Sequence, residues 1–347
     1  MSTIIEPRTV MVTGGAGYIG SHICLALLEQ GYEVVAVDNF CNSSRRALER
    51  VTSITGRQMK LYECDMRNGN MLMGIFDDNE VDAVIHLAGL KSVAESVKKP
   101  LEYYENNVGG TLTLLRVMAL QGCKKLVFSS SATVYGDQPV QPVTEAMPLL
   151  PQANPYGRTK AVVEGMIADA TRGGPELSAV LLRYFNPVGA HASGLLGEDP
   201  RGVPANLMPY LTGVASGRLP QLTVFGNDYD TPDGTGLRDY IHICDLAEGH
   251  VAALDALGDA PGLQTFNLGC GHAVSVLELV RAFEAATGAA VPYEIGPRRE
   301  GDLAACWADT SRAKEVLGFE PKRSIEDMCL DAWLFEQQNP GGYGDEE

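Results

Sequence analysis

The sequence contains no long apolar run, no paired cysteines and no block of Lys or Arg. A membrane-spanning helix needs about 20 consecutive apolar residues, and no segment here approaches that length. The eight cysteines include no C-x-x-C pair, so the spacing of a zinc site is missing and we expect no metal. Without a basic block, and with a formal net charge of −17, the chain is unsuited to nucleic acid or an anionic membrane.

The start of the chain also lacks a targeting pattern. Residues 1–10 show no basic region followed by an apolar one, as a signal peptide would. Several cysteines lie in apolar runs, where cysteine behaves as a small hydrophobic residue. We therefore expect a soluble protein of the reducing cytoplasm. Its 347 residues, 45% of them hydrophobic, are enough for a large core and two domains.

The first half of the sequence alternates short apolar segments with segments of helical periodicity. Continuous apolar strands separated by helices are typical of a parallel sheet covered on both faces. We predict an α/β fold in which residues 1–185 form a Rossmann-type, doubly wound parallel sheet. The expected strands are Thr9–Thr13, Glu33–Val37, Met59–Tyr62, Ala83–His86, Lys125–Ser129 and Ala179–Tyr184, and the expected helices are Ile19–Gln30, Arg45–Ile54, Leu72–Asp77, Leu101–Leu120 and Tyr156–Thr171.

The sequence changes character after Asn186. Pro, Gly and Asn become frequent up to Gly236, and loops replace the alternation of strands and helices. Residues 186–347 therefore predict a smaller C-terminal α/β domain that binds the substrate. Within it, residues 239–257 look like one more strand and helix, which we expect to return to the Rossmann domain.

A glycine-rich turn follows the first expected strand and predicts a dinucleotide site. Gly14, Gly17 and Gly20 have the spacing G-x-x-G-x-x-G and lead into a helix. The first glycine permits the tight turn, the second lets backbone approach a pyrophosphate, and the third lets helix and strand pack closely. Asp38 ends the next strand, where a carboxylate hydrogen-bonds an adenosine ribose and repels a 2′-phosphate. The pattern therefore favours NAD over NADP.

The motif N-P-Y-G-R-T-K contains the candidate catalytic residues. Asn154 and Pro155 are typical of a helix start, which places Tyr156 and Lys160 at i and i+4 on one helix face. A tyrosine base needs a pKa far below its usual value of about 10. The Lys160 ammonium, the helix N-terminus and the cationic nicotinamide ring would each favour the phenolate. Ser131 follows a strand and is placed to hydrogen-bond both the phenol and a substrate hydroxyl.

These motifs together resemble those of the extended short-chain dehydrogenase/reductase family. Within it, nearly the whole chain is similar to the UDP-glucose 4-epimerases. The similar runs are Gly14–His22, Ala88–Lys91, Ser129–Gly136, Leu182–Ala190, Phe225–Ile241 and Arg298–Cys306. The resemblance implies reversible epimerisation of UDP-galactose and UDP-glucose at C4, through a 4-keto sugar and transient reduction of NAD.

The resemblance also implies which residues contact the ligands. Further cofactor contacts fall on Tyr18, Ile19, Asn39, Asp65, Met66, Lys91, Asn106 and Phe185, besides Tyr156 and Lys160. The UDP-sugar falls against Ser131, Asn186, Asn206, Leu207, Arg238, Arg299, Asp302 and Cys306. The family often has two asparagines before Leu-Met-Pro-Tyr, whereas this chain has Ala205 and Asn206, so only the second amide is retained.

The residue types support an anion site in the second half. Arg238 and Arg299 stand out in an acidic sequence, and guanidinium groups suit a pyrophosphate. Asp302 is placed to accept hydrogen bonds from ribose hydroxyls, and Asn186 precedes a proline that keeps its backbone extended. The alternative for each arginine is an ordinary surface ion pair.

Other readings of the same fold remain open. A sugar-nucleotide dehydratase needs an acid and a base beside the catalytic serine, but residues 131–133 contain no carboxylate. A non-catalytic NAD sensor would have no use for a tuned phenol above a lysine. Cys306 either packs in the interior or leaves room beside the hexose for an N-acetyl group.

The resemblance further implies a homodimer. In that family the helices expected at Leu101–Leu120 and Tyr156–Thr171 pair with their copies in a four-helix contact. Leu112, Leu115, Val117 and Met118 are consistent with such a face, but they would serve equally well as core residues.

Overall fold

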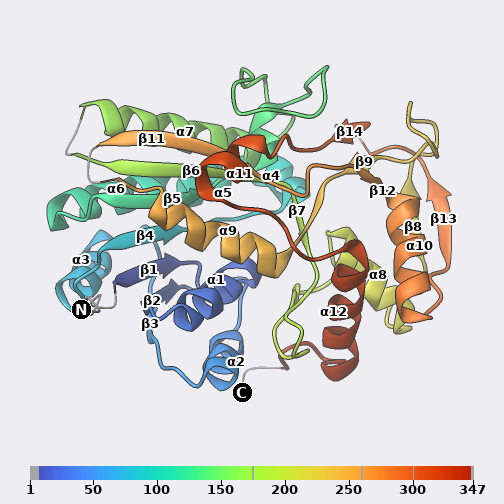
Figure 1. Cartoon of the computed structure of the whole chain (residues 1–347), viewed down its shortest axis with the longest axis horizontal. Coiled ribbons are helices and arrows are strands. Elements are labelled where there is room, and N and C mark those ends of the chain that lie inside the picture. The colour runs from blue at the N-terminus through green and yellow to red at the C-terminus, as the bar shows by residue number, and fades with distance from the viewer. Residues whose placement is uncertain (1–7, 174–175, 259–260, 300, 345–347) are drawn as a thin grey trace.

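The computed structural model describes residues 8–173, 176–258, 261–299 and 301–344. Its centre is a parallel sheet of seven strands in the order β11-β6-β5-β4-β1-β2-β3 (Figure 1). The strands are β1 (Thr9–Thr13), β2 (Glu33–Asp38), β3 (Lys60–Glu63), β4 (Ala83–His86), β5 (Lys125–Ser129), β6 (Ser178–Tyr184) and β11 (Gly262–Leu268). The strand order reverses between β1 and β4, so the predicted doubly wound, Rossmann-type sheet is confirmed.

The apolar runs correctly indicated six of these seven strands, each to within one residue at either end. The seventh strand, β11, was not predicted. Its sequence, G-L-Q-T-F-N-L, interrupts the apolar residues with Gly, Gln, Thr and Asn. Because β11 is an edge strand and its first residues are partly exposed, it does not need the continuous apolar run of a central strand.

Helices cover both faces of the sheet. Val10 and Val12 of β1 belong to one apolar cluster and Met11, between them, to another, because successive side chains of a strand point to opposite faces. The first cluster includes residues of α1 (Tyr18–Glu29), α2 (Arg45–Thr55) and α9 (Ile243–Asp255), and the second includes residues of α3 (Gly69–Asp77), α6 (Gly110–Gln121) and α7 (Pro155–Gly173). Two segments from the second half of the chain, α9 and β11, thus join the main sheet.

The prediction of one continuous helix over Leu101–Leu120 is wrong. The structure has α5 (Pro100–Tyr103), then one π-helical stretch (Tyr104–Gly109), then α6, all preceded by α4 (Val93–Lys98). A π-helical turn contains an extra residue, which rotates the side chains that follow. Here it accompanies the burial of the Asn107 amide, which hydrogen-bonds the backbone N–H and carbonyl of Leu90 at 2.8 and 3.0 Å.

The remaining elements pack beside the carboxyl ends of the strands. They enclose a separate apolar cluster that includes Val188, Leu211, Val224 and Phe283. These elements are β7 (Asn186–Val188), α8 (Leu207–Ala215), β8 (Leu222–Phe225), β9 (Leu237–Arg238), β10 (Tyr240–His242), β12 (Val274–Ser275), α10 (Val276–Thr287), β13 (Tyr293–Gly296), β14 (Ala305–Cys306) and α12 (Ile325–Gln338). The helix α11 (Ser311–Leu317) instead packs against β11 and α9, and its Ala313 belongs to the first cluster. The division of the chain into domains at residue 186 stays a prediction.

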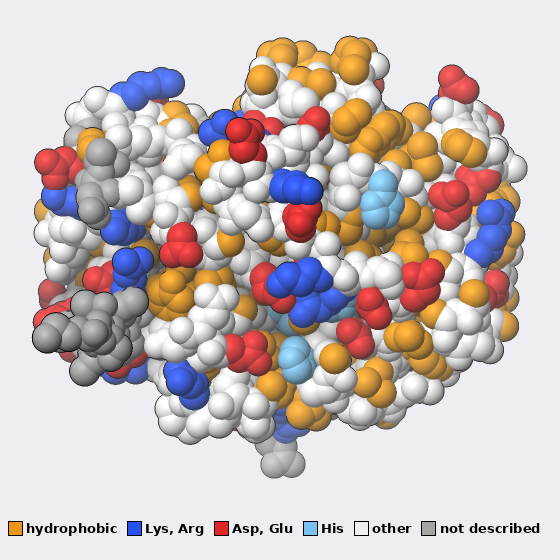
Figure 2. All heavy atoms as spheres, viewed as in Figure 1, with side chains coloured by type: hydrophobic (Ala, Val, Ile, Leu, Met, Phe, Trp, Pro, Cys, Tyr) orange, Lys and Arg blue, Asp and Glu red, His pale blue; other side chains and the backbone are white. Residues whose placement is uncertain are grey.

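The surface agrees with the acidic composition. On the face drawn in Figure 2, Lys and Arg side chains are interspersed with Asp and Glu and form no broad basic area. Among the described residues, no helix is both long enough and apolar enough to cross a membrane. All eight cysteines are free thiols.

The turn between β1 and α1 allows no side chain at two of its glycines. Gly14 has a φ of +70°, in the left-handed region that favours glycine. A Cβ atom on Gly20 would lie 2.0 Å from the carbonyl oxygen of Gly14, which is far inside van der Waals contact. The start of α1 can therefore approach the turn only if residue 20 has no side chain.

We expect Gly20→Ala to lower the free energy of unfolding by about 3 kcal/mol or more, because backbone must move to admit the methyl group. Gly74→Ala is the matched control, since a Cβ atom on this glycine of α3 meets nothing within 4 Å. That change should be neutral or should stabilise by up to about 1 kcal/mol. Urea denaturation of the two variants tests this; equal midpoints would contradict it.

Candidate active site

The predicted site residues gather at the carboxyl ends of the parallel strands. The glycine turn follows β1, the loop Ala88–Lys91 follows β4, and Ser131 follows β5. In a doubly wound sheet, ligands bind in the crevice where the strand order reverses, here between β1 and β4. The fold therefore brings the glycine turn and Ser131 to one edge of the sheet.

Asp38 connects the glycine turn to the loop after β2. Its carboxylate accepts hydrogen bonds from the backbone N–H of Ala16 and Phe40, both at 2.9 Å, and from the Ser43 hydroxyl at 2.8 Å. A carboxylate has about four acceptor positions, so one remains on Oδ2. The carboxylate thus stabilises the turn and still has an acceptor for a ribose hydroxyl.

The start of α1 has the donors that a pyrophosphate needs. Gly17 precedes the helix, and no side chain caps the first N–H groups. A Cβ atom on Gly17 would have only one neighbour within 4 Å, the Gly14 carbonyl oxygen at 3.4 Å, so the space above this residue is open. Tyr18 donates its hydroxyl hydrogen bond to the carbonyl of Gly189 at 2.7 Å, and Ile19 packs against the core. These features fit an anionic dinucleotide.

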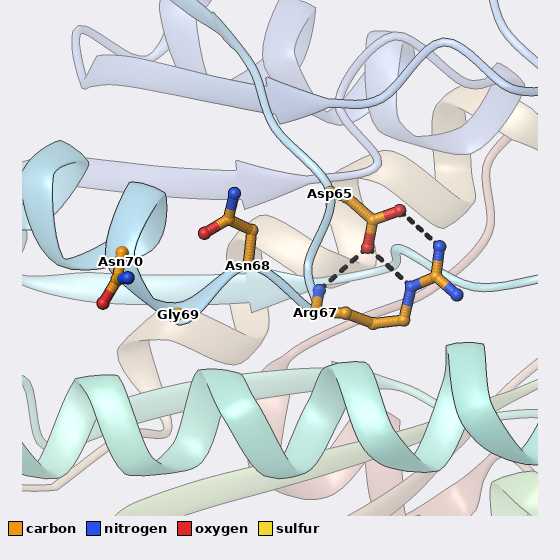
Figure 3. A pocket seen from close by; sticks show the side chains of 5 residues that line it. All are labelled: Asp65, Arg67, Asn68, Gly69 and Asn70. Atoms are coloured by element: carbon orange, nitrogen blue, oxygen red, sulfur yellow. Dashed lines mark hydrogen bonds and ion pairs between the residues drawn. The ribbon is translucent and has the colours of Figure 1, made fainter.

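Asp65 is fully engaged within the protein. Its carboxylate accepts from the backbone N–H, Nε and Nη2 of Arg67 at 2.8–2.9 Å (Figure 3). It also accepts from Asn39 Nδ2 at 3.3 Å. Chiefly through its hydrogen bonds, Arg67 lowers the pKa of Asp65 to about 2. Both residues line an open pocket of about 570 Å³ with Asn68, Gly69 and Asn70. A ligand could use this carboxylate only by displacing one of these donors, so its role as a cofactor contact stays a prediction.

Three other predicted cofactor residues lie in different settings. Met66 is buried in the core, which leaves its backbone for a ligand. Asn106 lies in the π-helical stretch, half-buried, next to the buried Asn107. Lys91 pairs with Glu198 at 3.2 Å, a carboxylate that also accepts from Asn206 at 2.8 Å. Sequence reasoning missed Glu198, because its partner Lys91 lies 107 residues away.

The predicted helix start is where the motif places it. The side chain of Asn154 accepts from the backbone N–H of Gly157 at 2.9 Å, and α7 begins at Pro155. Tyr156 is therefore in the first turn, and it is buried. Burial raises the pKa of its phenol above the usual value, while the nearby Ser131 hydroxyl acts in the opposite direction. Without a ligand, the phenol is protonated at neutral pH.

Lys160 is buried one turn further along α7. Its ammonium donates to the Ser129 carbonyl at 2.7 Å and lies 4.8 Å from the ring centre of Phe128. Burial lowers the pKa of Lys160 to about 8, so the side chain is still protonated at neutral pH. In the described structure no hydrogen bond joins it to Tyr156. Its effect on the phenol, which we expected to be direct, stays a prediction.

The predicted substrate residues form a second group. Arg238 donates to the carbonyls of Leu237 and Leu303 at 2.8 and 2.9 Å and forms an ion pair with Asp302. Arg299 lies 3.8 Å over the ring of Phe225. The structure therefore brings Arg238 and Asp302 into contact, while Arg299 is held by an aromatic ring and not by that pair.

Residues on short strands and at a helix start complete this group. Asn186 is an exposed residue of β7, Leu207 is the first residue of α8, and Cys306 pairs in register with Arg238 between β14 and β9. Cys306 packs in one cluster with the buried Phe185. Burial raises the pKa of the Cys306 thiol to about 11, so it is neutral.

One buried network escaped sequence analysis. His86, at the end of β4, contacts Thr13 Oγ1 at 2.7 Å and Thr111 Oγ1 at 2.9 Å. Thr111 donates to the Asn107 carbonyl, and the Asn107 amide donates to Thr159 of α7 at 3.1 Å. Burial lowers the pKa of His86 to about 3, so it is neutral. The sequence signal that could have indicated this network is the polar residue that ends each apolar strand, Thr13 in β1 and His86 in β4.

Residues 10–269 match the model of the NAD dependent epimerase/dehydratase family. The chain belongs to this family. The UDP-glucose 4-epimerase of Neisseria gonorrhoeae is 56% identical over 337 residues, which cover 97% of this chain and 100% of that protein. The matched region of this family member contains the main sheet, apart from Thr9 of β1, and the helix α7.

Solved structures of epimerases have the same fold. The UDP-glucose 4-epimerase of Bifidobacterium longum, in complex with NAD+ and UDP, is 52% identical, with a TM-score of 0.94 over 96% of this chain and 100% of that chain. The enzyme of Stenotrophomonas maltophila, with bound NAD and formylated UDP-arabinopyranose, is 50% identical, with a TM-score of 0.94 over 96% and 99%. This family member is thus similar in sequence and structure to UDP-glucose 4-epimerases along nearly its whole length.

The buried lysine leads to a prediction about stability. Its folded pKa of about 8 lies below the unfolded value of about 10.4, so the unfolded state binds this proton more tightly. The burial of protonated Lys160 therefore lowers the free energy of unfolding by its full amount below pH 8. The free energy of unfolding rises again as the pH increases from 8 to 10.4. Lys160→Met should be more stable than the wild type at pH 7 by about 1–3 kcal/mol, with a smaller difference at pH 10.

Urea denaturation at both pH values measures this difference. Lys124→Met is the control, because Lys124 is half-exposed in a surface ion pair with Glu176. Its effect should stay within about 0.5 kcal/mol at either pH. A Lys160→Met variant that is equally destabilised at pH 7 and pH 10 would contradict the prediction.

Proposed function

We propose that this chain interconverts UDP-galactose and UDP-glucose by epimerisation at C4, with NAD as its bound cofactor. The observation that carries the proposal is the buried Tyr156 phenol, which lies near Ser131 at the edge of the sheet where α1 starts uncapped. Similarity to UDP-glucose 4-epimerases over nearly the whole chain supports the same reaction.

The residues at the crevice fit NAD. The uncapped N–H groups at Gly17 and the start of α1 would hold the pyrophosphate, and the remaining acceptor of Asp38 would hold the ribose. Further contacts are proposed from Tyr18, Ile19, Asn39, Asp65, Met66, Lys91, Asn106 and Phe185. When bound, NAD supplies a centre that accepts hydride from C4 of the sugar and gives it back.

The protein's own contribution to the chemistry is a proton transfer. Tyr156 removes the proton of the sugar 4-hydroxyl and later returns it to the same oxygen. Burial opposes the phenolate, so the nearby Lys160 ammonium and the Ser131 hydroxyl have to offset that cost. Because Ser131 accepts from Thr133, its own proton is available for the phenol oxygen or the sugar.

The second group of residues would bind the UDP part of the substrate. Arg238 and Arg299 are suited to the diphosphate, and Asp302 to the ribose hydroxyls. Asn206, at the start of α8, and Asn186, on β7, add amides beside Leu207. Firm binding of UDP leaves the hexose free to turn, which the exchange of faces at C4 requires.

We also propose a homodimer in a reducing cytoplasm. Apolar side chains of α4, α5 and α6 are strongly exposed: Val97 by 62%, Leu101 by 81% and Leu120 by 75%. Val117 and Met118 are core residues, so only part of the run noted in the sequence is available for a partner. Covering the exposed side chains with a second copy would remove them from water. The free thiols fit a reducing compartment.

Tyr156→Phe tests the reaction. The variant keeps the ring but loses the ionisable oxygen, so turnover of UDP-galactose should fall by at least about 10²–10⁴-fold. Ring packing is retained, so NAD content and UDP binding should stay near wild type. Tyr184→Phe is a control for a second, partly buried tyrosine near the site. Epimerisation by Tyr156→Phe at the wild-type rate would refute the assigned base.

The breadth of the substrate range depends on Cys306. This thiol is small, neutral and half-buried beside Phe185, so it leaves room that a large side chain would fill. We propose that N-acetylated UDP-hexoses are also accepted. Cys306→Tyr should then reduce their turnover by about ten- to a hundred-fold, as overpacking costs about 1–3 kcal/mol.

Both substrates should be assayed on both proteins. UDP-galactose turnover should change far less than UDP-N-acetylgalactosamine turnover when Cys306 becomes tyrosine. Equal slowing of the two, or a wild type without any activity on the N-acetylated sugar, would show that Cys306 does not set the range.

A further inference from the structure

A long segment without helices or strands joins β7 to α8 (Figure 1), and side-chain contacts attach it to the main sheet from two sides. Near its start, the Gly189 carbonyl accepts from Tyr18, in the first turn of α1. Further along, Glu198 binds Lys91, in the loop that follows β4. The same carboxylate binds Asn206, the residue before α8, so it also ties down the end of the segment.

A second contact fixes the segment to the other side of the crevice. Arg201 donates from Nη1 to the carbonyl of Cys41 at 3.2 Å and from Nη2 to the carbonyl of Ser43 at 3.0 Å. Both carbonyls belong to the loop that follows β2. That loop also includes the Ser43 hydroxyl, which hydrogen-bonds Asp38.

The strand order shows what lies between these two contacts. β1 is the neighbour of both β4 and β2, so the glycine turn after β1 lies between the loop of Lys91 and the loop of Cys41 and Ser43. A segment attached to both loops must cross the crevice beside that turn. The crossing point is where the uncapped N–H groups of α1 are found.

We propose that residues 189–206 form a strap that retains the bound dinucleotide, fastened by Glu198 on one side and Arg201 on the other. This rests on the NAD binding proposed above. An epimerisation returns its cofactor to the starting state in every cycle, so the cofactor has no need to leave. A strap across the crevice raises the barrier to its escape.

The Glu198 and Arg201 contacts of the strap differ in burial and in charge. Glu198 neutralises Lys91, and the Glu198 side chain is nearly buried, so this contact is stable. Arg201 is exposed and binds neutral carbonyls, so its positive charge is not cancelled there. That charge lies beside a crevice suited to a pyrophosphate and adds to its retention. The Arg201 side is also the one that opens first, because exposed hydrogen bonds are readily exchanged for water.

Exchange of the bound cofactor measures the strap directly. The purified holoenzyme is mixed with an excess of isotopically labelled NAD, and the bound fraction is analysed by mass spectrometry over time. Arg201→Ala should exchange about tenfold faster than the wild type, the effect of losing two exposed hydrogen bonds from a charged group. Arg201→Lys keeps a donor and the charge, and should restore most of the retention.

Arg312→Ala is the matched control. Arg312 is also exposed and donates to a backbone carbonyl, that of Thr265 at 3.0 Å, but on the edge strand β11. Arg312→Ala should exchange NAD at the wild-type rate. Its melting temperature should change by about as much as that of Arg201→Ala. If Arg201→Ala and Arg312→Ala both hold NAD and exchange it equally, the strap is refuted while the cofactor assignment stands. A wild type that neither contains nor takes up NAD would overturn the cofactor assignment and the strap with it.

Discussion

The arrangement of the site depends on the close approach of Gly20 to the carbonyl of Gly14. With any side chain at residue 20, the first turn of α1 would be pushed away from the end of β1. That turn contains the uncapped N–H groups, and Tyr18 in it anchors the segment that crosses the crevice. Asp38 depends on it as well, because its hydrogen bond to the Ala16 N–H requires the turn to lie against the loop after β2.

One face of α7 connects the chemistry to the interior. Tyr156, Lys160 and Glu164 follow one another at intervals of four residues and are all buried. Glu164 forms an ion pair with Arg183 of β6 and accepts from Ser130 at 2.6 Å. Its charge raises the pKa of Lys160 and so opposes the effect of burial. A buried amine that lowers the stability of the fold is typical of a functional site, where activity is retained at the expense of maximal stability.

Short sequence patterns predicted those elements that interactions between residues close in sequence determine. Continuous apolar runs identified β1 to β6, and the Asn-Pro pair identified the start of α7. β11 was missed because an edge strand can include polar residues, and the π-helical stretch was missed because the apolar spacing around it still reads as one helix. The contacts of Glu198 with Lys91 and of Arg201 with Cys41 join residues more than 100 positions apart, so no window of sequence contains both partners.

The position of β11 has a consequence for how the chain is made. The last strand of the main sheet, β11, is synthesised some 80 residues after β6, the strand with which it pairs. Until that segment leaves the ribosome, one long edge of β6 has unpaired backbone groups and apolar side chains on both faces. The nascent chain therefore passes through a stage in which its first half resembles a finished domain but still has an open, adhesive edge.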